Sequence, residues 1–198
     1  DPDGDNNPNN NGVGTPVNTT SVSLLGLAKR TVQTINNSDG SADVTFEFNI
    51  ENFGTTNLTN IQVVENLAAA FAPCGVPTVL SLTSDDYTVN PAFNGNGMNN
   101  MLAAGNLLNV SDKGAILLTV RIPACATTMF TNTATLTGTN PTGGTVTDVS
   151  QNGADPDPDA DGNPNNNGVG TPVNTTSTSL LGLAKRTVQT INNSDGSA

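Results

Sequence analysis

The stretch DVTFEFNIENF, residues 43–53, alternates between polar and apolar side chains almost without interruption. Its apolar positions are two residues apart and share one face of an extended chain: Val44, Phe46, Phe48 and Ile50. Strict alternation over this length predicts a β-strand with one buried face and one solvated face.

Seven further segments have the composition of strands and are separated by turn sequences such as NNSDG, NGNG and NPTGG. They are residues 23–34, 57–65, 78–83, 106–110, 115–122, 129–138 and 145–149. Many short strands with Gly-rich and Asn-rich turns predict an all-β fold, an immunoglobulin-like antiparallel β-sandwich over residues 21–150 with extended acidic linkers. Its expected core is Leu25, Leu27, Phe46, Phe48, Ile50, Ile61, Val63, Leu117 and Val120.

The composition excludes several classes of function. With 17 acidic and 6 basic residues the net charge is −11, so no basic patch is available to bind nucleic acid. No apolar run approaches the length of a bilayer span, so membrane insertion is not expected. The absence of His removes Ser-His-Asp and Cys-His catalysis, and no P-loop occurs, so we expect that the chain is not an enzyme.

Cys74 and Cys125 are the only cysteines. An even number of cysteines in a chain of secreted character predicts a disulfide, which the chain-entropy model values at about 4 kcal/mol for a loop of this length. The alternative is a pair of small buried thiols.

Residues 1–42 repeat as residues 157–198, with 39 of 42 positions identical. The repeat predicts a tandem array with a period of 156 residues. On this basis residues 1–20 are an acidic linker shared with a preceding repeat, residues 151–176 are the next linker, and residues 177–198 begin another repeat. The apolar residues 179–191 then need a partner, which is either the continuing chain or a neighbouring subunit that accepts a donated strand.

The phrases LGLAKRTV, VTFEFNIENFGTTNLTNIQVVENL, FTNTATLTG and GGTVTDVSQNGADPDPDADGNP occur in this order. Together they resemble the conserved repeat domain of bacterial cell-surface proteins, an immunoglobulin-like module found in tandem in long secreted chains. The resemblance covers residues 20–163, and its clearest feature is the Asn-x-Gly-Thr-Thr segment after the second strand. It implies an extracellular location and a structural or adhesive role.

Oxygen donors recur at alternate positions of DPDPDADGNPNNNG, residues 155–168. This pattern suits Ca²⁺, which takes about six to eight oxygen ligands, and D-x-D-x-D-G also opens an EF-hand loop. Counted from Asp157, the twelfth position is Gly168 and not the bidentate Glu that completes such a loop. The predicted ligands are Asp155, Asp157, Asp159, Asp161, Asn163 and Asn165, together with Asp1, Asp3 and Asp5 of the first copy.

Because this loop is incomplete, its missing ligands would come from backbone carbonyls or from a domain surface, with Asp148 and Gln151 as candidates. Bound Ca²⁺ would then lock neighbouring domains together. The alternative is an unliganded polar spacer that its prolines and charges keep extended.

Two kinds of covalent modification are also hypotheses. Lys29, Asn132 and Glu47 fall on expected strands and have the residue types that form an isopeptide bond in some immunoglobulin-like surface domains, although Lys29 and Arg30 are more simply an exposed basic pair. Glycans are candidate partners at Asn-x-Ser/Thr sequons, including those of Asn18, Asn36, Asn57, Asn109 and Asn174.

The sequence therefore predicts a structural subunit of an extracellular fibre or stalk, in which Ca²⁺ bound by Asp-rich linkers stiffens an array of β-sandwich domains. The alternative is an adhesin module that binds a surface glycan or protein through exposed loops such as NPAFNGNGMNN, residues 90–100.

Overall fold

The structure is a computed structural model that describes residues 4–7, 12, 20–176, 183–186, 188–189 and 194–195. Strands dominate the described residues, and helix is confined to three short turns: α1 (Leu67–Ala70), η1 (Ala72–Cys74) and η2 (Pro164–Asn166). The predicted all-β sandwich is confirmed.

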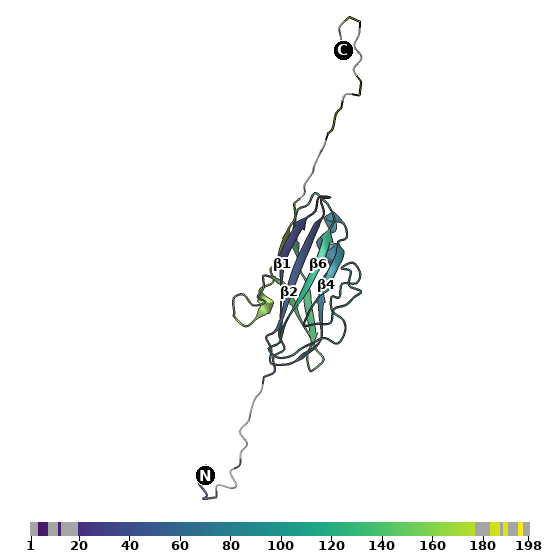
Figure 1. Ribbon diagram of the computed structural model, residues 1–198. Coiled ribbons are helices and arrows are strands. Elements are labelled where there is room, and N and C mark those ends of the chain that lie inside the picture. Colours follow the sequence, from purple (N-terminus) through teal and green to yellow (C-terminus); the bar gives the residue numbers. More distant parts are fainter. Residues whose placement is uncertain are drawn as a thin grey trace.

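The larger sheet has five strands in the spatial order β10, β1, β2, β6 and β4. Figure 1 shows β1, β2, β6 and β4 side by side in this order. Their bounds are β10 (Gln151–Asn152), β1 (Leu25–Asn36), β2 (Ala42–Asn52), β6 (Lys113–Ile122) and β4 (Thr78–Thr83). All neighbouring pairs are antiparallel except β1 and β10, which are parallel.

The remaining strands form a four-stranded sheet and a two-stranded ribbon. The four-stranded sheet has the order β5 (Leu107–Leu108), β3 (Leu58–Val64), β8 (Thr135–Thr139) and β9 (Thr145–Val149). The ribbon pairs β7 (Met129–Asn132) with β11 (Thr171–Asn174). The expected single strand over residues 129–138 was therefore wrong, because it changes partner between β7 and β8.

The core follows the alternation predicted for β2, whose inward positions are buried from Val44 to Ile50. One predicted core residue, Leu117, was wrong: its side chain is 43% exposed, whereas Ile116 and Leu118 are buried. Both neighbours are apolar, so the sequence of β6 did not show which of its residues face the core. A shift of one residue moves every side chain of a strand to the other face.

Residues 151–176, expected to be an extended linker, pack along the domain. They contribute β10, η2 and β11, and Thr171 and Val173 are fully buried. Pro156 and Pro164 are buried against Gly26, where an added Cβ would lie 2.8 and 2.7 Å from their Cβ atoms. The folded unit therefore extends to the end of this segment.

The described chain enters and leaves this unit at opposite ends of β1. Near the start of β1, the Val22 amide donates to Thr55 Oγ1 at 3.0 Å. At the far end, the Thr176 amide donates to Asn36 Oδ1 at 2.9 Å. Since β1 has 12 residues, these ends lie about 40 Å apart, along the long axis of the domain in Figure 1.

Cys74 and Cys125 form the predicted disulfide, with their Cα atoms 5.0 Å apart. The described part of the chain contains no helix with the length and hydropathy of a membrane span.

Candidate metal centre

Three aspartates at alternate positions come together in the turn that follows Pro156. One carboxylate oxygen from each of Asp157, Asp159 and Asp161 lies within 4.8 Å of the others. The turn closes because the Gly162 amide donates to Asp157 Oδ2 at 2.9 Å, and because Ala160 and Gly162 adopt left-handed backbone conformations. This group could hold a metal ion.

Asparagines orient the carboxylates of this cluster. The side chain of Asn167 donates to Asp159 Oδ1 at 3.2 Å, and that of Asn166 donates to Asp161 Oδ2 at 2.9 Å. From the sequence, Asn163 and Asn165 were predicted as ligands. The contacts of Asn166 and Asn167 with the aspartates were not predicted. The missed pair could be recognised only from the 3₁₀ turn η2, which brings these side chains back towards the acids.

The donor set fits a hard divalent cation. Asp157 is buried, and its Oδ1 atom has no hydrogen-bond partner. A buried carboxylate oxygen is costly to leave unpaired, and three carboxylates this close together repel one another. An oxygen-ligated cation such as Ca²⁺ would remove both penalties.

The protonation of the cluster follows from its surroundings. Burial raises the pKa of Asp157, and the hydrogen bond from Asn167 lowers the pKa of Asp159. A low pKa keeps Asp159 in the anionic form that a metal ligand requires.

The other predicted ligands in this segment lie outside the group of three. Asp155 is exposed, and its Oδ1 accepts from the Asp157 amide at 3.0 Å. The Asn163 amide donates to Asp161 Oδ1 at 2.8 Å. In the orientation that satisfies both of its side-chain atoms, Asn165 donates to the Leu25 carbonyl and to Asp148 Oδ1.

Of the three ligands predicted in the first copy of the acidic phrase, Asp5 is described, and its Oδ1 accepts from the Asn7 amide at 2.7 Å. Asp1 and Asp3 lie outside the described residues.

Asp148, considered above as an additional ligand, instead accepts hydrogen bonds within the domain. It is buried, and its Oδ2 accepts from the Leu27 amide at 2.7 Å. Burial raises the pKa of Asp148 to about 6. Together with Asn165 and the two buried prolines, Asp148 fixes the acidic segment to the side of β1.

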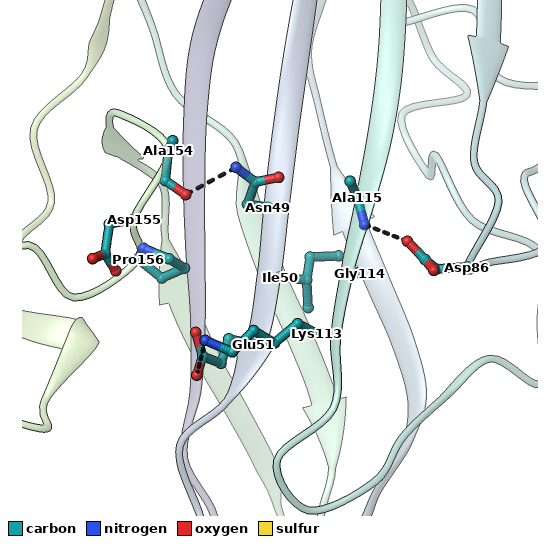
Figure 2. Close-up of a pocket in the computed structure, with 10 residues that line it drawn as sticks. All are labelled: Asn49, Ile50, Glu51, Asp86, Lys113, Gly114, Ala115, Ala154, Asp155 and Pro156. Carbon is teal, nitrogen blue, oxygen red and sulfur yellow. Dashed lines mark hydrogen bonds and ion pairs between the residues drawn. The ribbon is translucent and has the colours of Figure 1, made fainter.

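A surface pocket of about 480 Å³ is lined by residues 154–156 of this segment together with residues of β2 and β6 (Figure 2). The Asn49 side chain donates to the Ala154 carbonyl at 2.8 Å, and Lys113 pairs with Glu51 at 2.8 Å. Asp86 accepts from the Ala115 amide. Asp155 is also drawn, and it accepts from the amide of Asp157, which is not drawn. The residues drawn in Figure 2 include no nucleophile activated by a base.

No family model matches the chain, and the search of curated proteins found no match. The fold and the site define a disulfide-bonded all-β sandwich with an acidic cluster fixed to its flank.

Proposed function

We propose that the chain is a repeat unit of an extracellular fibre or stalk. The observation that carries this proposal is the path of the chain, which enters at one end of β1 and leaves at the other. In a sequence that repeats every 156 residues, such a path stacks domains end to end. The disulfide favours an oxidising, extracellular environment.

In this proposal, Ca²⁺ stiffens the segment that leads out of the domain. Bound by Asp157, Asp159 and Asp161, it would hold the acidic turn in one conformation just before β11, the last strand before the next repeat. The ion then stiffens the exit from one domain, since the cluster rests on the flank of its own domain. Chelation should loosen this segment without unfolding the sandwich.

Limited proteolysis of the 198-residue chain tests the role of the metal. With Ca²⁺, residues 155–170 should resist cleavage, and with chelator they should be cut at least several-fold faster while the sandwich stays intact. Asp159→Asn should be cut at the faster rate in both conditions, and Asp85→Asn, at an exposed residue away from the cluster, should behave as wild type. Equal cleavage of the wild type with and without chelator would rule out the metal role.

Electron microscopy of several such repeats in tandem tests the fibre itself. The expected particles are thin rods that become more flexible on chelation. Compact globules under both conditions would contradict the end-to-end arrangement, whatever the metal result.

The segment expected to pair with a neighbour, residues 179–191, lies largely outside the described residues. Among those described, Leu183 and Val188 are 94% and 83% exposed. Exposed apolar side chains in this segment support pairing with a following repeat or with another subunit.

An adhesin remains the second candidate, and the pocket in Figure 2 is the observation that favours it. Its volume falls in the range of small-ligand sites, and a glycan array probed with the chain tests it directly.

A further inference from the structure

Lys29 is the one basic residue of the chain that lies in the interior. It is 0% exposed, whereas the other five Lys and Arg residues are all exposed. Its ammonium lies 4.6 Å from the ring centroid of Phe46 and 5.1 Å from that of Phe48. The expectation of an exposed basic pair with Arg30 was wrong, because consecutive strand residues point to opposite faces and Lys29 takes the inward one.

The acid beside Lys29 is Glu65. It directly follows β3, is also 0% exposed, and places Oε2 2.5 Å from Lys29 Nζ. Glu47, the acid expected from the sequence, instead pairs with Arg30 on the outer face. The hypothesis was therefore wrong about the acid. An ion pair inside a core is costly to desolvate and is a weak source of stability.

The third residue is Asn132, at the end of β7 and 2% exposed. It is in register with Thr171, whose hydroxyl donates to the Lys29 carbonyl at 2.7 Å. On the same face of β7, Phe130 packs on Phe71, which packs on Phe46 beneath the Lys29 ammonium. Asn132 therefore faces the interior that holds Lys29.

The register between β3 and β8 places Glu65 near Asn132. The last pair between β3 and β8 joins Val64 to Thr135, so the next position sets Glu65 opposite Ala134, two residues from Asn132. Three polar side chains, one each from β1, β7 and the end of β3, thus converge in an apolar interior.

Two atoms of this group lack any hydrogen-bond partner: Glu65 Oε1 and Asn132 Nδ2. Buried polar atoms are rarely left unpaired, and here one atom is an acceptor and the other is an amide nitrogen. The Asn132 amide nitrogen is also the group that an attacking amine would displace.

We propose that Lys29 and Asn132 form an intramolecular isopeptide bond and that Glu65 transfers the protons. The Lys29 ammonium passes one proton to Glu65, and the neutral amine attacks Asn132 Cγ. Glu65 relays a second proton from the amine to the leaving nitrogen, the Cγ–Nδ2 bond breaks, and ammonia departs. One C–N bond replaces another without a change of oxidation state, and Glu65 remains protonated beside the new amide.

The surroundings of Lys29 favour this step. Burial lowers the pKa of Lys29, although the charge of Glu65 opposes the shift, so the neutral nucleophilic amine is more accessible than at the surface. The product also replaces a buried ion pair with neutral groups.

The cross-link would join the first strand of the domain to β7, which pairs with the last strand, β11. A pull applied between the two ends of the unit would then meet a covalent bond between these strands. The inference does not depend on the fibre proposal, because the bond can be present in an isolated chain.

The intact mass of the 198-residue chain, measured after reduction of the disulfide, tests the proposal. The expected mass is lower than the sequence mass by one ammonia, and a tryptic digest should contain a peptide that joins Lys29 to Asn132. Lys185 is the sequence equivalent of Lys29 in the following repeat, so the peptide that contains it should be unlinked and serves as an internal control.

Variants assign the bond to its residues. Glu65→Gln and Asn132→Ala should restore the full sequence mass, and Asn132→Asp should lose one water in place of ammonia. Gln151→Ala is the matched control, because among the described residues Gln151 is the other buried amide whose nitrogen lacks a partner. Gln151 pairs in register with Ala28 and therefore faces away from Lys29, so this variant should still lose ammonia.

Three results would overturn the proposal. The first is a wild-type mass equal to the sequence mass. The second is an ammonia loss that persists in Asn132→Ala. The third is an ammonia loss that mild alkali reverses, because a succinimide at an Asn-Gly pair such as Asn96–Gly97 also releases ammonia but hydrolyses under these conditions.

Discussion

The acidic turn at Asp157, Asp159 and Asp161 and the interior pair of Lys29 and Glu65 treat charge in opposite ways. In the turn, backbone amides and asparagines supply donors to most of the carboxylate oxygens, and two of the three acids are exposed. In the interior, the charged groups have each other, two aromatic rings and no solvent. The turn is assembled from residues within one short segment, whereas the interior pair joins residues 36 positions apart. The acidic cluster can therefore be predicted from the spacing of its aspartates in the sequence. The buried ion pair cannot, because its two residues are far apart in the sequence.

The largest expected loss of stability is at the interior pair. Glu65→Gln leaves Lys29 either as a buried ammonium without a counter-charge or without its cross-link, and it should lower the free energy of unfolding by about 3–5 kcal/mol. Chemical denaturation with the disulfide intact measures this change.

The matched control is Glu47→Gln, which removes the acid from the half-exposed pair with Arg30 on the other face of the sheet. It should cost no more than about 1 kcal/mol. Equal losses for the two variants would mean that the interior pair is no more important than a surface one.

The residues explain how far the sequence could be interpreted. The alternation of polar and apolar residues in β2 was enough to predict both the strand and its buried face. A strand with one buried and one solvated face produces this alternation directly in its sequence. The TPVN segment of β11 gave no such signal, since it is short, contains Pro172 and becomes a strand only by pairing with β7. Likewise, the aspartate spacing predicted the cluster, but the sequence could not show that Gly26 lets it rest on β1.

The second prediction tests whether the acidic segment belongs to the domain. Gly26→Ala places a methyl group 2.7–2.8 Å from Pro164, Phe53 and Pro156, so it should displace the segment and cost about 1–3 kcal/mol. Protease cleavage within residues 155–170 should also increase. Gly168→Ala, where the added Cβ meets only the Val149 carbonyl at 3.9 Å, should change neither quantity. Resistance to protease in Gly26→Ala would show that the segment is held by other contacts.

The third prediction uses pH to examine the contact beneath the segment. The folded pKa of Asp148 is about 6, above its ordinary value, so its neutral form is favoured by folding. The stability that it contributes is present at acidic pH and is lost as the pH rises through about 6. Asp148→Asn removes this dependence, so the wild type should lose about 1–2 kcal/mol relative to the variant between pH 4 and pH 7, a range that allows for partial solvent screening.

Thermal or denaturant unfolding across this pH range measures the difference. Asp85→Asn, at an exposed position, should run parallel to the wild type. A constant difference between wild type and Asp148→Asn would show that Asp148 has the same pKa in the folded and unfolded states.

The smallest effect is expected at the acidic turn, where its sign is more informative than its size. Without a divalent cation, Asp159→Asn relieves repulsion between close carboxylates and should leave the free energy of unfolding unchanged or slightly raised. With excess Ca²⁺ the order should reverse, because an ion that binds only the folded state stabilises the wild type by an amount that grows with the logarithm of its affinity. Denaturation of both proteins with chelator and with Ca²⁺ gives the four values needed. A variant that is less stable by the same amount in both conditions would mean that Asp159 acts through its hydrogen bond from Asn167 and not through a metal ion, and the acidic turn would then resemble the interior pair in holding its charge with protein groups alone.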